Sequence, residues 1–152
     1  MTDRIPSTRS GRDGPLVRTV VHPEVPRPRS SEDNLLEVRR IRWSEDLLVV
    51  SATGEIDLAT AGRLERALWG DLPAATVLDL TEVTFLGVAG LRVIESAATR
   101  AHAERRATGV VASTRPVLRL LHLFGVDAHV SVYQYLATAI REVSMAVPAP
   151  KP

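Results

Sequence analysis

The chain of 152 residues contains no cysteine, which excludes disulfide bonds, thiolate metal sites and cysteine nucleophiles. Aromatic residues make up only 4%, so a core must be built from aliphatic side chains. No apolar run approaches the roughly 20 residues that a membrane-spanning helix needs. The first thirty residues also lack the apolar stretch of a secretory signal. These absences predict a cytoplasmic protein that is not inserted in a membrane.

The chain also lacks an excess of either positive or negative charge, because its formal net charge is only +1. This balance gives the chain no overall attraction to nucleic acid, so no direct nucleic-acid partner is expected. The histidines do not follow the spacing of metal ligands, and we expect neither a metal site nor a cofactor; they are His22, His102, His122 and His129.

Proline and arginine divide the chain into three parts. Residues 1–34 are rich in Pro, Arg and Ser, which predicts a disordered arm. Its arginines alternate with acidic residues, which favours a soluble tether over a nucleic-acid contact. Residues 146–152 form a Pro-rich tail that is also expected to be disordered. The folded domain is therefore predicted over residues 35–145.

Hydrophobic periodicity within the domain predicts alternating strands and helices. Strands are expected at 36–43, 47–54, 76–80, 109–112 and 129–132, and helices at 60–69, 88–107 and 133–145. A further helix is expected between the N-cap Thr114 and the stop signal Gly125. Repeated strand–helix units predict an α/β fold with four to five strands, a parallel centre, an antiparallel edge pair and about four helices.

Two segments stand out as candidate sites. The first, Gly54-Glu55-Ile56-Asp57, ends a predicted strand. Its carboxylates lack the His, Ser or Lys neighbours that acid–base catalysis would need, whereas Asp57 is well placed to accept hydrogen bonds from the following helix. The second is Phe85-Leu86-Gly87-Val88-Ala89-Gly90-Leu91, a loop that leads into a helix. A helix N-terminus attracts anions, but the segment lacks the Lys and Ser/Thr of a P-loop.

In this order and spacing, the two segments resemble the STAS domain of bacterial anti-sigma factor antagonists, over about residues 36–141. In that family the start of the helix usually reads Asp-Ser-Ser-Gly-Leu or Asp-Ser-Ala-Gly-Leu, and its first Ser is phosphorylated. Here Gly87 stands at the Asp position and Val88 at the Ser position. The resemblance therefore implies the family scaffold without its usual phosphorylation site.

The resemblance implies a binding protein rather than an enzyme, which captures a kinase-like anti-sigma factor and thereby frees a sigma factor. It places the partner surface at the end of the second strand and the start of the long helix. The implied contact residues are Glu55, Asp57, Leu58, Thr60, Phe85, Leu86, Gly87, Val88, Ala89 and Arg92. If this helix start docks on a partner, Val88 should be at least partly exposed.

Phosphorylation needs a hydroxyl group, and residues 85–92 contain no Ser, Thr or Tyr. The remaining candidate acceptors are Thr84, expected in the loop after its strand, and Ser113 and Thr114, expected to cap a helix. Two other functions stay open. The domain could be a STAS regulatory subunit of another complex, such as a lipid-transport ABC system. A small-ligand or nucleotide sensor would need a pocket with convergent polar groups.

Overall fold

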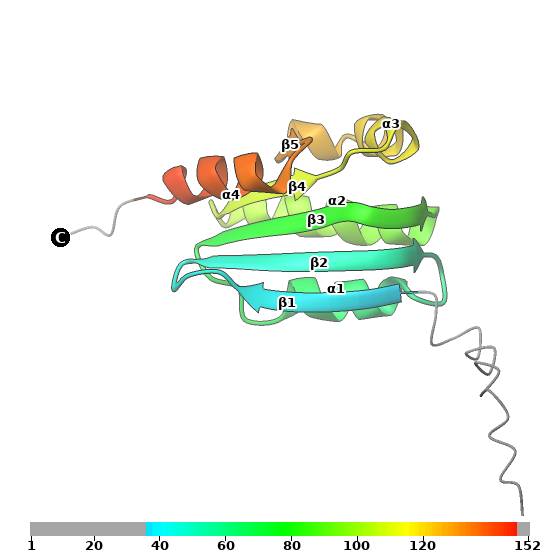
Figure 1. Ribbon diagram of the computed structural model, residues 1–152, viewed down its shortest axis with the longest axis horizontal. Helices are drawn as coiled ribbons and strands as arrows, with labels where there is room; N and C mark the ends of the chain where they lie inside the picture. The colour runs from blue at the N-terminus through cyan, green and yellow to red at the C-terminus, as the bar shows by residue number, and fades with distance from the viewer. Residues whose placement is uncertain (1–35, 149–152) are drawn as a thin grey trace, which may run out of the picture.

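The computed structural model describes residues 36–148, so the predicted arm 1–34 lies outside the described residues. One five-stranded sheet carries helices on both faces (Figure 1). The elements in chain order are β1 (Leu36–Arg42), β2 (Leu47–Ile56), α1 (Ala61–Trp69), β3 (Ala75–Leu86), α2 (Val88–Ala103), β4 (Ala107–Val111), α3 (Arg115–Leu123), the 3₁₀ turn η1 (Val126–Ala128), β5 (Ser131–Tyr133) and α4 (Leu136–Met145).

The strands lie in the order β1-β2-β3-β4-β5. The short polar turn between β1 and β2 makes these two strands an antiparallel edge pair, with Leu36 opposite Gly54. The other neighbouring strands are parallel and are joined by crossovers that contain helices. This topology confirms the predicted α/β fold with a parallel centre.

The side chains of the central strands alternate between two apolar layers, because successive residues of a strand point to opposite faces. Leu48, Val50 and Leu78 face α1, α2 and α3 in the larger layer. Leu47 and Val77 face α4 in the smaller one. Figure 1 shows α1 and α2 behind the sheet. The sheet is therefore buried on both faces at its centre, as its continuous apolar strands require.

The third strand is longer than the sequence pattern predicts. It was expected at 76–80, but it continues to Leu86 and stays paired with β2 throughout. Two irregularities in that pairing interrupt the simple alternation of apolar residues. As a consequence, Thr84 lies within the strand and is exposed, rather than in a loop.

Other boundaries also differ from the prediction, including the end of β2 and both ends of β4. Helix α2 ends at Ala103 rather than near residue 107, because Arg105 adopts a positive φ of 54° that a helix does not permit. Strand β5 and helix α4 each begin later than predicted, since Tyr133 pairs with Val111 in the sheet. Thr114 does occupy the N-cap of α3, but its side chain makes no capping hydrogen bond.

None of the helices within residues 36–148 combines the length and apolar character needed to cross a membrane.

Candidate functional site

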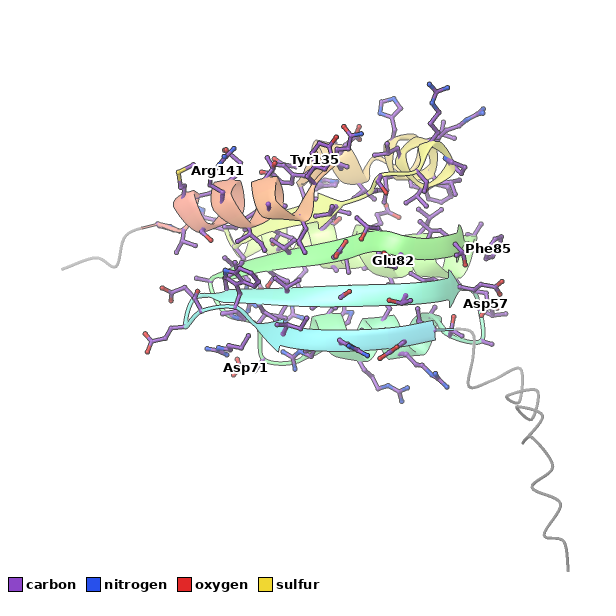
Figure 2. The ribbon with its side chains drawn as sticks, viewed as in Figure 1. Asp57, Asp71, Glu82, Phe85, Tyr135 and Arg141 are labelled. Atoms are coloured by element: carbon purple, nitrogen blue, oxygen red, sulfur yellow. The ribbon has the colours of Figure 1, made fainter. Side chains whose placement is uncertain are left out.

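The two segments singled out in the sequence meet at one end of the sheet. Strands β2 and β3 run in parallel, so their C-terminal ends coincide, with Glu55 opposite Phe85. The backbone N–H of Gly87 donates a 2.8 Å hydrogen bond to the carbonyl of Ile56 and ties the two segments together. Figure 2 shows Asp57 and Phe85 at this end of the sheet and Asp71 at the other.

The turn after β2 is held by Asp57 and Thr60. A carboxylate oxygen of Asp57 accepts hydrogen bonds from the N–H groups of Ala59 at 2.9 Å and Thr60 at 3.0 Å. The Thr60 hydroxyl accepts the N–H of Asp57 at 2.9 Å and lies 2.9 Å from the carbonyl of Glu55. This network confirms that Asp57 satisfies backbone donors before helix α1. It also leaves the intervening Leu58 pointing outward, with 88% of its surface exposed.

The start of α2 approaches the end of β2 closely because residue 90 is glycine. A Cβ atom at Gly90 would lie 2.4 Å from the Cγ2 of Ile56 and 2.9 Å from the Cδ1 of Leu86. Gly87 occupies the N-cap and offers no side chain to the first turn of α2. The absence of bulk at these two positions brings Val88 beside the turn that carries Leu58.

Three apolar side chains are exposed together at this end of the molecule. Leu58, Phe85 and Val88 are exposed by 88%, 51% and 55%, and they line one shallow hollow with Asp57, Ala89 and Arg92. We call Leu58, Phe85 and Val88 the strand-end patch. Single exposed apolar residues are ordinary on a protein surface, whereas these three are contiguous. The exposure of Val88 confirms the expectation from the sequence.

Two of the residues expected in the partner surface are buried instead. Leu86 contributes to the larger apolar layer, on the same face of β3 as Leu78 and Leu80. Thr60 is enclosed by its hydrogen bonds to the preceding turn. Both residues support the site from beneath and cannot contact a partner directly. Glu55 is exposed beside Phe85, and Arg92 is exposed on the first turns of α2.

The site contains hydrogen-bonding groups but no hydroxyl at the start of α2. The alternative acceptors Thr84, Ser113 and Thr114 are all exposed, on β3 and before α3. Within residues 36–148, no group of three or more His, Asp and Glu side chains is placed to hold a metal ion. The chemistry that this site offers is therefore apolar contact, backbone hydrogen bonding and the charges of Glu55, Asp57 and Arg92.

This geometry agrees with the comparison to known families. Residues 39–139 match the family model of the STAS domain, which covers well over half of the chain. The chain belongs to the STAS domain family. The matched span includes the whole strand-end patch and the structured turn at Asp57.

Relatives of this STAS domain include antagonists of anti-sigma factors. The chain is 38% identical over 98 residues to the anti-sigma-F factor antagonist RsfB of Mycobacterium tuberculosis, covering 62% of this chain and 80% of the relative. The crystal structure of an anti-sigma factor antagonist from Mycobacterium paratuberculosis is 32% identical, with a TM-score of 0.66, covering 73% of this chain and 96% of that one.

The same fold also occurs in a transporter. The STAS domain of a SulP transporter from Vibrio cholerae is 20% identical and has a TM-score of 0.56, covering 67% of this chain and 84% of that one. At this identity the likeness shows the fold alone. Function must therefore be argued from the site and from the more similar antagonists.

Sequence reasoning missed a second surface beside the patch of this STAS domain. Pro116 and Leu120 of α3 line a groove that also includes Phe85 of β3. One local signal is Leu123, an apolar residue at the end of α3 that is 64% exposed.

Proposed function

We propose that this STAS protein is a binding protein without enzymatic activity that captures a kinase-like anti-sigma factor and thereby frees a sigma factor. The observation that carries the proposal is the strand-end patch, where three apolar side chains are exposed on a well-ordered framework of hydrogen bonds. The names of the relatives that are 38% and 32% identical support an anti-sigma factor as the partner. The proposed place of action is the bacterial cytoplasm, where sigma factors act.

The proposed contact surface consists of the exposed and half-buried residues of the two segments. It comprises Glu55, Asp57, Leu58, Phe85, Gly87, Val88, Ala89 and Arg92. The apolar members would supply the desolvated centre of the interface, and the charged members would form its rim. We further propose that phosphorylation does not switch binding at residue 88, because a valine side chain cannot accept a phosphate.

The substitution Val88→Asp tests this surface. In the complex it would bury a carboxylate without a partner, which typically costs several kcal/mol. In the free protein the same carboxylate lies at a helix N-terminus, where it is mildly stabilising by roughly 0.3–1 kcal/mol. We therefore expect binding to be abolished while thermal stability stays the same or rises slightly.

Titration calorimetry against purified anti-sigma factors of the same bacterium, with a melt of each variant, measures both effects. Ile41→Asp is the matched control, because Ile41 is also exposed but lies on β1, opposite Val49 and away from the patch. If Val88→Asp binds as tightly as the wild type, the patch is not the docking surface. If no anti-sigma factor binds the wild type, the proposed function itself is wrong.

A further inference from the structure

A groove adjoins the strand-end patch on the side of α3. It has a volume of about 630 Å³ and lies between the second half of β3 and the start of α3, with Glu82, Thr84, Phe85, Pro116 and Leu120 among its walls. A second hollow of about 690 Å³ continues over the outer face of α3 to Leu123. Pro116 and Leu120 line both hollows, so a single surface runs from Phe85 to Leu123. We call it the α3 groove.

Part of the apolar surface of the α3 groove lies outside the core. The buried residues of α3 are Val117 and Leu121, which pack against the sheet. Leu120 is only half-buried and Leu123 is 64% exposed, three residues further along the same helix. The helix therefore presents a second apolar edge toward solvent, next to the exposed ring of Phe85.

Two arginines border this apolar edge. Arg115 and Arg119 lie one turn apart on α3 and line the same hollow as Leu123. Within residues 36–148, the side chains of these two arginines make no ion pair or hydrogen bond. The side chains of Arg39, Arg100, Arg106 and Arg141, in contrast, all pair with carboxylates. Helix α3 contains no acidic residue. Glu82, on the β3 wall, is the one carboxylate among the residues that line the two hollows.

The remaining basic side chain of α3 is already paired. The Nδ1 atom of His122 lies 2.6 Å from a carboxylate oxygen of Asp127 in η1. The two arginines are thus the unpaired charges of the helix. Arginine next to exposed apolar surface is the combination that recognises carboxylates at protein interfaces.

We propose that the α3 groove binds an acidic segment of the same partner that docks on the strand-end patch. The segment would place an apolar side chain against Leu120 and Leu123 and its carboxylates against Arg115 and Arg119. Phe85 belongs to both surfaces, so a partner seated on the patch reaches the groove without a gap. This inference rests on the proposed function, because it takes the anti-sigma factor as the partner.

The test is a double charge reversal, Arg115→Glu with Arg119→Glu, in the full chain. Its matched control is Arg66→Glu with Arg141→Glu, which changes the net charge equally on α1 and α4. The probe is the purified anti-sigma factor that binds the wild type in the titration above. We expect the α3 variant to bind about tenfold or more weakly, while the control binds within about twofold of the wild type.

Ionic strength gives a second readout. Raising KCl from about 50 mM to about 300 mM should weaken wild-type binding and should affect the α3 variant much less, since salt screens exposed charges. Unchanged melting temperatures would show that both variants are folded. Leu123→Ala, which removes only apolar contact, should weaken binding by about threefold to tenfold.

Three results would overturn the inference. The α3 variant could bind as the control does, while Val88→Asp still abolishes binding; the proposed function would then stand and the α3 groove would be no part of it. Sedimentation could show that the wild type is a dimer and that the double reversal makes it monomeric. A second copy of the chain would then be the occupant of the α3 groove. Amide NMR spectra of the free full chain could show that the double reversal shifts resonances of residues 1–34, which would make the arm the occupant.

Discussion

At the scale of single residues, the proposed absence of a phosphorylation switch depends on Val88. It is the first residue of α2, half-exposed, and its branched side chain carries no hydroxyl. A phosphate at this point would add a charge of about −1.5 to −2 to an otherwise apolar patch. The chain cannot acquire that charge at residue 88. Under the proposed function it therefore binds constitutively or is controlled by other means, such as its arm, its abundance or an input on the partner.

We therefore predict that an anti-sigma kinase with ATP adds no phosphate to residues 85–92, as measured by intact mass and peptide mapping. Val88→Ser is the control variant, because it restores a hydroxyl at the start of α2 and reports that the kinase is active. The hydroxyls of Thr84, Ser113 and Thr114 are exposed. A phosphate mapped to one of them in the wild type would show that regulation by phosphorylation has moved to another residue and has not been lost.

At the scale of elements, the position of α2 depends on the missing side chain at Gly90. Its neighbours Ile56 and Leu86 are both buried, so neither has room to move away. The close approach of α2 to β2 is what brings Val88 and Leu58 into one hollow. The glycine therefore supports both the packing and the shape of the patch.

We predict that Gly90→Ala lowers the free energy of unfolding by about 1–3 kcal/mol, because its Cβ overfills this contact. Gly62→Ala in α1 is the matched control: a Cβ there meets nothing within 4 Å, so higher helix propensity should stabilise the protein by about 1 kcal/mol. Urea denaturation of both variants measures the difference. Equal effects of the two substitutions would show that α2 does not press on Ile56 as described.

The sequence was sufficient to predict most elements and the meeting of the two segments. Apolar periodicity identified the buried faces of the helices, such as Leu91, Ile94 and Ala98 of α2. The resemblance to the STAS domain placed Asp57 and Val88 on one surface, and the parallel pairing of β2 and β3 explains why the two segments meet. The elements needed only local pattern, whereas the shared surface needed the resemblance.

The remaining features depend on contacts between distant parts of the chain. At Gly54, a φ of 107° lies beside one of the irregularities in the β2–β3 pairing, and this irregular pairing puts Val83 rather than Glu82 in the larger apolar layer. The α3 groove forms because Phe85 and Leu120 line one hollow although 35 positions separate them in the sequence. No local pattern of residues carries either piece of information.

At the scale of the whole molecule, the proline spacing of residues 1–34 and their lack of apolar periodicity leave this arm little to contribute to a core. We predict that deleting residues 1–30 changes the melting temperature by no more than a few degrees. Differential scanning calorimetry of the full and shortened chains is the measurement. A decrease of more than about 5 °C would show that the arm contributes at least about 1 kcal/mol to stability.

Under the proposed function, this protein frees a sigma factor by competing for its anti-sigma factor. The most direct measurement follows the fluorescence anisotropy of a labelled sigma factor bound to its anti-sigma factor, while the chain is added without ATP. We predict that the wild type lowers the anisotropy to that of the free sigma factor, and that Val88→Asp at the same concentrations leaves it unchanged. If the anisotropy stays high although the wild type binds the anti-sigma factor, the protein does not free the sigma factor.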